Sequence, residues 1–168
     1  MTALVRHPAS RCDAIDSIHA RIDGPVVTFD VRGRIDELLI PPPAPPERTD
    51  ELWRHSCFEL FVREEGEGYE EFNFSPSGQW AAYRFDRYRE GMAPLDIPPP
   101  LIETEISENR LLVRVTLQQE RRGRCRIGLA AVIEEKGGNK SYWALNHPPG
   151  APDFHHRDCF ALDLPPAG

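Results

Sequence analysis

Short runs of alternating apolar and polar residues follow one another along most of the chain, and this two-residue period is that of β-strands. The clearest runs are Cys57–Val62, Tyr69–Phe74 and Trp80–Phe85. Ser75-Pro76-Ser77-Gly78 separates the last two runs and reads as a turn, because proline presets one backbone angle and glycine tolerates a positive φ. We therefore predict an antiparallel meander of three strands in the middle of the chain.

Further strand-like runs lie on both sides of this meander. Asp23-Gly24-Pro25 and Glu108-Asn109-Arg110 are turn signals with an alternating run on each side, so each predicts a hairpin. No stretch has the period of an amphipathic helix, and helix is expected for at most a turn or two, near Ala9–Asp16 or Tyr88–Met92. The other predicted strands are Ala3–Arg6 (as a short edge strand), Ser17–Ile22, Val26–Arg34, Ile102–Ser107, Leu111–Leu117, Arg124–Glu134, Ser141–Leu145 and Cys159–Leu164.

About eight to ten short strands without a helix predict an all-β fold, an antiparallel β-sandwich of two sheets of the jelly-roll or immunoglobulin-like kind. A length of 168 residues fits a single domain spanning residues 1–168. The 17 prolines cluster between the predicted strands, and we interpret these clusters as rigid connections.

Composition narrows the classes of partner. The net charge of -7 argues against nucleic acid or an anionic membrane as the main partner. No stretch approaches the roughly 20 apolar residues of a membrane span, and the N-terminal residues lack the apolar segment of a secretory signal. The four cysteines show no C-x-x-C spacing and are expected to stay reduced. We therefore expect a cytoplasmic protein.

One set of aromatic and polar side chains has the chemistry of a carbohydrate site. Indole faces stack on sugar rings, while carboxylate, amide and guanidinium groups bind hydroxyl groups in directional pairs. The alternative is that the tryptophans pack in the core or at an edge, with Glu59 solvated on an open face. The set comprises Trp53, Arg54, Glu59, Asn73, Trp80 and Trp143.

A second candidate lies late in the chain, within Ser141–Cys159. Its histidines and carboxylates are the side chains that ligate transition metals. Their spacing matches no standard ligand pattern, and adjacent histidines in a strand would point to opposite faces. The alternative is that they fix the loop by hydrogen bonds to its backbone. The weak candidate ligands are His147, Asp153, His155 and His156.

Two other chemistries, haem ligation and catalysis, bear on the remaining residues. Met92 is the one internal methionine, and methionine with histidine can ligate haem, although a lone methionine more often fills a packing gap. No nucleophile–base pair or other catalytic motif can be identified from spacing, so we name no catalytic residues and favour a non-enzymatic role over an enzymatic one.

Three blocks of the sequence together resemble the DOMON-like family of bacterial proteins, which is related to the family-nine carbohydrate-binding modules. The blocks are L-W-R-H-S-C-F-E-L-F-V, Y-E-E-F-N-F-S-P-S-G-Q-W-A-A-Y-R-F-D-R-Y-R-E-G-M and S-Y-W-A-L-N-H-P-P-G-A-P-D-F-H-H. The resemblance covers about Ala3 to Leu164. It implies a β-sandwich with a ligand site on one sheet or at its rim, and a ligand that is either a sugar or a haem.

The resemblance also implies which residues bind. For a sugar, Trp53 and Glu59 resemble the tryptophan and glutamate of the family's entry strand. For a haem, Met92 with His147, His155 or His156 would be the axial pair; the haem-binding relatives are typically exported. The remaining counterparts implied for a sugar site are Trp143 and Asn146 on the late strand and Arg84 as the arginine.

We conclude from the sequence that a non-catalytic module binds a small carbohydrate, either a sugar or a nucleotide sugar, without a cofactor. Two alternatives remain. One is an interaction or scaffold domain without a small ligand, which would bind a partner protein or a second copy of itself. The other is a haem-binding domain that uses Met92 and His155. The expected ligand-binding residues are Trp53, Glu59, Asn73, Arg84, Trp143 and Asn146.

Overall fold

The strands of the protein pair side by side into one continuous antiparallel sheet. The computed structural model describes residues 1–119 and 123–166. The strands are β1 (Thr2–Arg6), β2 (Ile15–Asp23), β3 (Val26–Gly33), β4 (Cys57–Arg63), β5 (Tyr69–Phe74), β6 (Trp80–Phe85), β7 (Ala93–Pro94), β8 (Leu101–Ser107), β9 (Arg110–Thr116), β10 (Cys125–Glu134), β11 (Lys140–Ala144) and β12 (Leu162–Leu164).

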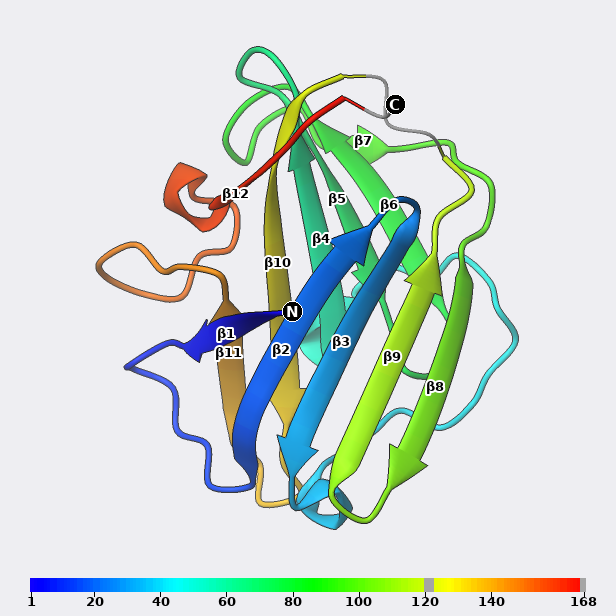
Figure 1. Ribbon diagram of the computed structural model, residues 1–168, viewed down its shortest axis with the longest axis vertical. Coiled ribbons are helices and arrows are strands. Elements are labelled where there is room, and N and C mark those ends of the chain that lie inside the picture. Colours follow the sequence, from blue (N-terminus) through cyan, green and yellow to red (C-terminus); the bar gives the residue numbers. More distant parts are fainter. Residues whose placement is uncertain (120–122, 167–168) are drawn as a thin grey trace.

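The sheet curls so that its two halves face each other (Figure 1). Its order is β7-β6-β5-β4-β10-β11-β1-β2-β3-β9-β8, and β12 pairs with β10 beside this path. β1 pairs with β11 on one side and with β2 on the other, so it joins the halves rather than forming the predicted edge. The prediction of an antiparallel all-β fold is confirmed. The division into two separate sheets is not confirmed, because β1 makes the sheet continuous.

The main core lies between the two halves. Phe29 of β3 and Phe58 of β4 are fully buried, and their ring centroids lie 4.9 Å apart across this core. On β4, Phe58 and Leu60 face inward, as the alternation predicts.

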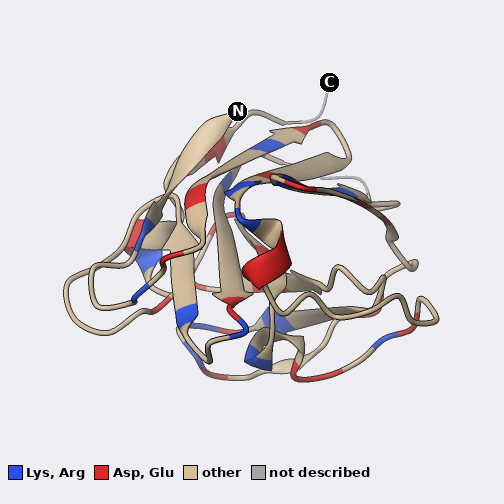
Figure 2. Ribbon diagram, turned by 90° about the horizontal axis from the view of Figure 1, so that it is seen from below, with Lys and Arg blue, Asp and Glu red and all other residues tan. Residues whose placement is uncertain are grey.

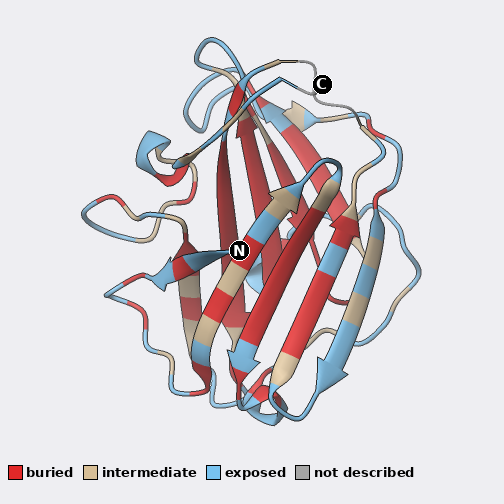
Figure 3. Ribbon diagram, viewed as in Figure 1, coloured by how far each residue is buried: buried red, intermediate tan, exposed pale blue. Residues whose placement is uncertain are grey.

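A second apolar layer covers the outer face of β4, β5, β6 and β10. Nearly every residue of β4 and β5 is buried, in contrast to the alternating burial of β2 (Figure 3). Phe61 of β4 points outward and packs against Phe160, with their ring centroids 5.9 Å apart. The cover is formed by the 3-10 turn η2 (Leu52–Arg54) and by the segment that leads from β11 through η3 (Arg157–Cys159). These strands are therefore buried on both faces.

The helical turns form elsewhere than the sequence predicts. Ala9–Asp16 is not helical, because the backbone N–H groups of Asp13 and Ala14 donate to the Glu135 carboxylate instead of to carbonyls within a helix. The 3-10 turns of the described chain are η1 (Ile35–Glu37), η2 and η3.

Tyr88–Met92 is not helical either. Arg89 and Gly91 have φ values of 55° and 68°, in the left-handed region that a right-handed helix excludes. Glu90 instead closes a tight turn, in which its N–H donates to the carbonyl oxygen of Arg87.

Charged residues of both signs are interspersed over the strands and loops (Figure 2). Within residues 1–119 and 123–166, no helix is long and apolar enough to cross a membrane. That the protein binds neither nucleic acid nor a membrane stays a prediction.

Substitution of a glycine at the end of β3 tests how closely β3 packs against the start of β2. Gly33 has φ +148°, and a Cβ atom there would lie 2.1 Å from the carbonyl oxygen of Ala14. We expect Gly33→Ala to lower the free energy of unfolding by about 2 kcal/mol or more, measured by urea denaturation. Gly137→Ala is the matched control, since nothing lies within 4 Å of its added Cβ. Equal stability of the two variants would contradict the packing described.

Candidate functional site

A cavity of about 280 Å³ opens through the outer apolar layer. Its floor is formed by outward-facing side chains of β4, β5 and β10, and its walls by η2, β11, the turn after β6 and the segment before η3. The lining residues are Trp53, Arg54, Glu59, Glu71, Arg89, Val132, Lys140, Tyr142, Pro152, Phe154 and His155.

Glu59 is a buried carboxyl group on the floor of this cavity. It lies on β4 directly between Ala130 of β10 and Asn73 of β5, and the residue is 3% exposed. Among the residues that the structure describes, none donates a hydrogen bond to this carboxyl. Burial, and secondarily the charge of Glu71, raises the pKa of Glu59 well above its ordinary value. Because this carboxyl lines the cavity and has no protein donor, it is available to bond a ligand there.

Glu71 of β5 is the second floor carboxyl. It is 5% exposed, and burial raises its pKa to about 7. The Asn73 side-chain amide donates to Glu71 Oε1 at 3.0 Å, and this bond and the charge of Arg89 both oppose the rise. His155 Nε2 lies 3.5 Å from Oε2 of the same carboxyl. Both floor carboxyls thus hold protons more tightly than exposed glutamates do.

A hydrogen-bonded chain fixes His155 beside the floor. The backbone N–H of Arg89 donates to Tyr69 Oη at 3.1 Å, and Tyr69 Oη lies 2.7 Å from His155 Nδ1. We assign the Tyr69 hydroxyl proton to the bond with Nδ1, which places the ring proton on Nε2, facing the Glu71 carboxyl. Burial, followed by the charge of Arg89, lowers the pKa of His155 to about 4, so the ring is neutral at pH 7.

Arg89 is held in place by Asp153. Its Nη2 lies 2.8 Å from Asp153 Oδ1, while the Tyr88 hydroxyl donates to the other carboxylate oxygen. The two hydrogen bonds and the charge of Arg89 lower the pKa of Asp153 against the effect of its burial. The turn after β6 is thereby tied to the segment before η3, and both walls of the cavity are fixed.

The mouth of the cavity carries an exposed indole. Trp53 in η2 is 48% exposed, and the guanidinium of Arg54 lies 5.5 Å from the centroid of its ring. Arg54 also pairs with Glu51 at 2.7 Å, and the Lys140 ammonium donates to the backbone carbonyl oxygen of Arg54. An accessible tryptophan at the rim and buried carboxyls at the floor are the parts that stack on, and hydrogen-bond to, a sugar ring.

The structure brings together part of the predicted sugar site. Trp53 and Glu59 line the same cavity, and Asn73 lies behind it, bonded to Glu71. Trp143 points the other way, into the main core, where it is 6% exposed and its indole N–H donates to Ser141 Oγ at 2.9 Å. Its neighbour Tyr142 lines the cavity instead.

Arg84 and Asn146 lie outside the cavity. Arg84 is on the opposite face of β6 from Tyr83, which belongs to the outer layer. Asn146 is exposed, and its amide donates to the Asp158 carbonyl oxygen at 3.2 Å. The expectation that they contact the same ligand as Glu59 has no support in this geometry.

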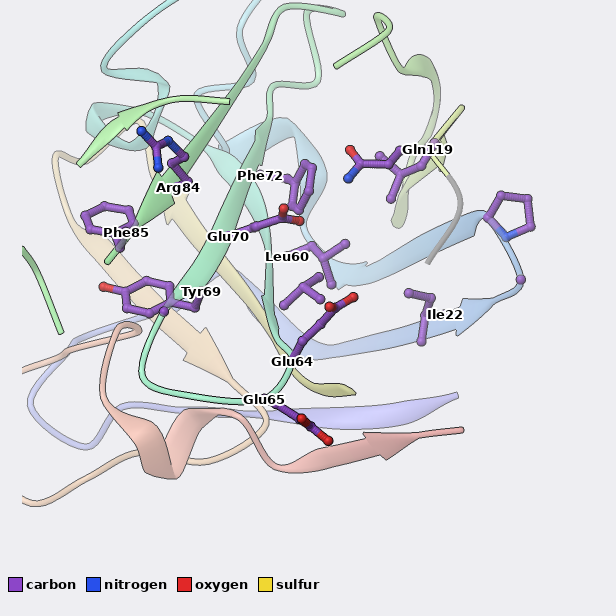
Figure 4. Close-up of a pocket in the computed structure, with 15 residues that line it drawn as sticks. Ile22, Leu60, Glu64, Glu65, Tyr69, Glu70, Phe72, Arg84, Phe85 and Gln119 are labelled. Atoms are coloured by element: carbon purple, nitrogen blue, oxygen red, sulfur yellow. The ribbon is translucent and has the colours of Figure 1, made fainter. Parts of the chain in front are cut away.

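Arg84 lines a different cavity of about 540 Å³, formed by the ends of the strands (Figure 4). Leu60 and Phe72 contribute apolar surface to this cavity, and Glu64 and Glu70 contribute carboxyl groups. Glu64 is exposed, while Glu70 is partly exposed and burial raises its pKa. The smaller cavity, with its buried and unpartnered carboxyl, is therefore the better candidate despite its size.

The proposed metal ligands are spread along their loop rather than gathered. His147 Nε2 bonds the carbonyl oxygen of Val5, and His156 Nδ1 accepts from the N–H of Asp158 at the start of η3. Asp153 pairs with Arg89, and His155 bonds Tyr69. Within the described residues, no group of three such side chains could hold a metal ion. The alternative, in which they bond the backbone of the loop, fits His156 and Asp153, whereas His155 bonds a side chain and His147 bonds the backbone of β1.

The residues proposed for haem are also not brought to one cavity. Met92 is 57% exposed and does not line the cavity that contains His155. The geometry thus offers no axial pair from Met92 and His155.

Sequence reasoning missed several residues of the cavity. Alternation places Glu71 on the same strand face as Asn73, but Glu71 is not among the residues expected to bind. Arg89 and Lys140 carry no comparable signal, because their positions depend on a turn and on a strand end.

Comparison with known proteins supports the fold. No family model matches the chain, and no curated protein matches it. A solved structure from Bacteroides uniformis, described as a "putative carbohydrate-binding protein", superposes with a TM-score of 0.56 at 13% sequence identity. The match covers 85% of this chain and 74% of that one. At this identity the likeness establishes a shared all-β fold.

The buried state of Glu71 predicts a dependence of stability on pH. Below about pH 4.5 the Glu71 carboxyl is protonated in the folded and in the unfolded protein. Between about pH 4.5 and pH 7 it ionises only in the unfolded protein, so the free energy of unfolding falls as the pH rises through this range. Glu71→Gln keeps an acceptor for Asn73 and removes this loss. We expect the variant to gain on the order of 3 kcal/mol relative to wild type between pH 4.5 and pH 8, measured by urea denaturation.

Glu70→Gln is the matched control for that experiment. Glu70 neighbours Glu71 on the other face of β5. Burial raises the pKa of Glu70 too, but this residue is partly exposed, so its pH-dependent difference should be smaller. A Glu71→Gln difference that does not change with pH would contradict the burial of an ionisable carboxyl there.

Proposed function

We propose that the protein is a non-catalytic carbohydrate-binding module and that its ligand occupies the cavity between Trp53 and Glu59. The observation that carries the proposal is the Glu59 carboxyl, which is buried, has no hydrogen-bond partner among the described residues and lines a cavity with an exposed tryptophan at its mouth. We further propose that the chain is a DOMON-like domain and that its curled sheet is a variant of that family's β-sandwich.

The contacts follow from the geometry. A sugar ring stacks on Trp53, while its hydroxyl groups reach Glu59 and Glu71 on the floor. A protonated carboxyl both donates and accepts, so Glu59 can bond a hydroxyl without bearing a charge. The volume of about 280 Å³ is at the small end of ligand pockets and suits about one sugar ring.

The fold likeness supports this proposal to a limited extent. The Bacteroides uniformis protein is described as carbohydrate-binding, and the two chains share a fold over most of their lengths. Because a fold hosts many functions, the weight of the proposal rests on the cavity itself.

Binding can be tested by calorimetry with a panel of monosaccharides, disaccharides and nucleotide sugars. Stacking plus a few hydrogen bonds predicts a Kd of about micromolar to millimolar. Trp53→Ala should weaken binding about tenfold or more, because it removes the stacking surface, while leaving the thermal unfolding temperature within a few degrees of wild type, because Trp53 is exposed.

Arg84→Ala and Asn146→Ala are the controls for this experiment. Both residues were candidates on sequence grounds and lie outside the cavity. Their binding should equal that of wild type. Binding that survives in Trp53→Ala but is lost in Arg84→Ala would move the ligand to the other cavity and overturn the proposal.

A further inference from the structure

The two carboxyl groups at the floor of the cavity have no basic side chain paired with them, because the basic side chains nearby are paired with other carboxylates or are neutral. Arg89 is paired with Asp153 at 2.8 Å, and Arg54 is paired with Glu51 at 2.7 Å. Neither pair includes Glu59 or Glu71. His155, the other basic side chain near the floor, is neutral at pH 7. The two floor carboxyls are thus left without a bonded cation among the described residues.

The floor is also rich in hydrogen-bond acceptors. Glu59 lies directly opposite Asn73, and Glu71 lies two residues before Asn73 on the same face of β5, so the three side chains are neighbours. The Asn73 amide nitrogen donates to Glu71, whereas the Asn73 Oδ1 atom is buried and accepts no hydrogen bond from the described residues. Even when Glu59 holds its proton and a ligand hydroxyl adds one donor, the oxygen atoms of Glu59, Glu71 and Asn73 outnumber the donors that reach them.

An ammonium group meets both requirements. It carries three donors and one positive charge, and charge-assisted hydrogen bonds to carboxylates are stronger than neutral ones. We propose that the natural ligand of this cavity carries a protonated primary amine, as in an amino sugar, and that the amine binds between Glu59 and Glu71. This inference rests on the proposed carbohydrate-binding function and specifies the ligand class.

The charged side chains that line the cavity determine the orientation of the ligand. Lys140 and Arg54 line the cavity beside the exposed Trp53, whereas Arg89, whose charge reaches the floor carboxyls, is paired with Asp153. An amine is attracted to the floor and repelled by Lys140, which orients it inward. The uncharged remainder of the sugar then lies against Trp53.

The test compares D-glucose with glucose derivatives in which an amine replaces the hydroxyl at C2, C3 or C6, and with N-acetyl-D-glucosamine. Calorimetry at pH 7 should show at least one amine derivative binding about tenfold more tightly than glucose. Acetylation should remove the gain, because it removes the charge. Repeating the titration in two buffers of different ionisation enthalpy should show proton release, since the cation favours the ionised carboxyls.

Two variants link the preference to the floor. Glu59→Gln should abolish the preference for the amine while changing the affinity for glucose less. Glu70→Gln is the matched control on the opposite face of β5 and should retain the preference. If both variants retain it, the amine binds elsewhere and the inference fails.

The outcomes separate this inference from the function on which it depends. Glucose binding that requires Trp53, with no amine derivative binding more tightly, overturns the inference and leaves carbohydrate binding intact. If neither glucose nor any other member of the two sugar panels binds, both proposals fail.

Discussion

The structure depends on the burial of β4 and β5 on both faces. One face packs on the main core between the two halves of the curled sheet, and η2 with the segment before η3 covers the other. Strands buried in this way are ordinarily apolar throughout. Here the outer face places Glu59, Glu71 and Asn73 in the buried layer, and the cover leaves a cavity above the two carboxyls. The polar exceptions to the pattern are thus the residues around which a ligand site is built.

The same burial explains the electrostatics of the site. Carboxyl groups that are largely shielded from water retain protons, and the neighbouring cation, Arg89, is already paired with Asp153. Tyr69 and His155 are fixed by hydrogen bonds before any ligand arrives, so binding need not order them. The cavity therefore combines a preformed polar floor with a stacking surface at its mouth.

Much of the fold could be predicted from the sequence, because alternation and turn residues are local signals. The strands of the meander and both hairpins form where the pattern predicts them. The site was harder, because a sheet buried on both faces gives no exposed side by which to orient a strand. Tyr142 and Trp143 are both aromatic, and only the register of β11 against β10 shows that Trp143 enters the core. Arg89 reaches the cavity through a left-handed turn that no periodicity reveals.

The most direct test of this account is the ionisation of the two floor carboxyls, followed by ¹³C NMR of the glutamate side chains as the pH is raised. Glu59→Gln and Glu71→Gln assign the two signals. The account predicts that Glu71 titrates near pH 7 and that Glu59 remains protonated well above the ordinary range of glutamate. Two signals that both titrate near 4.5, the value of an exposed glutamate, would contradict the burial of these carboxyls.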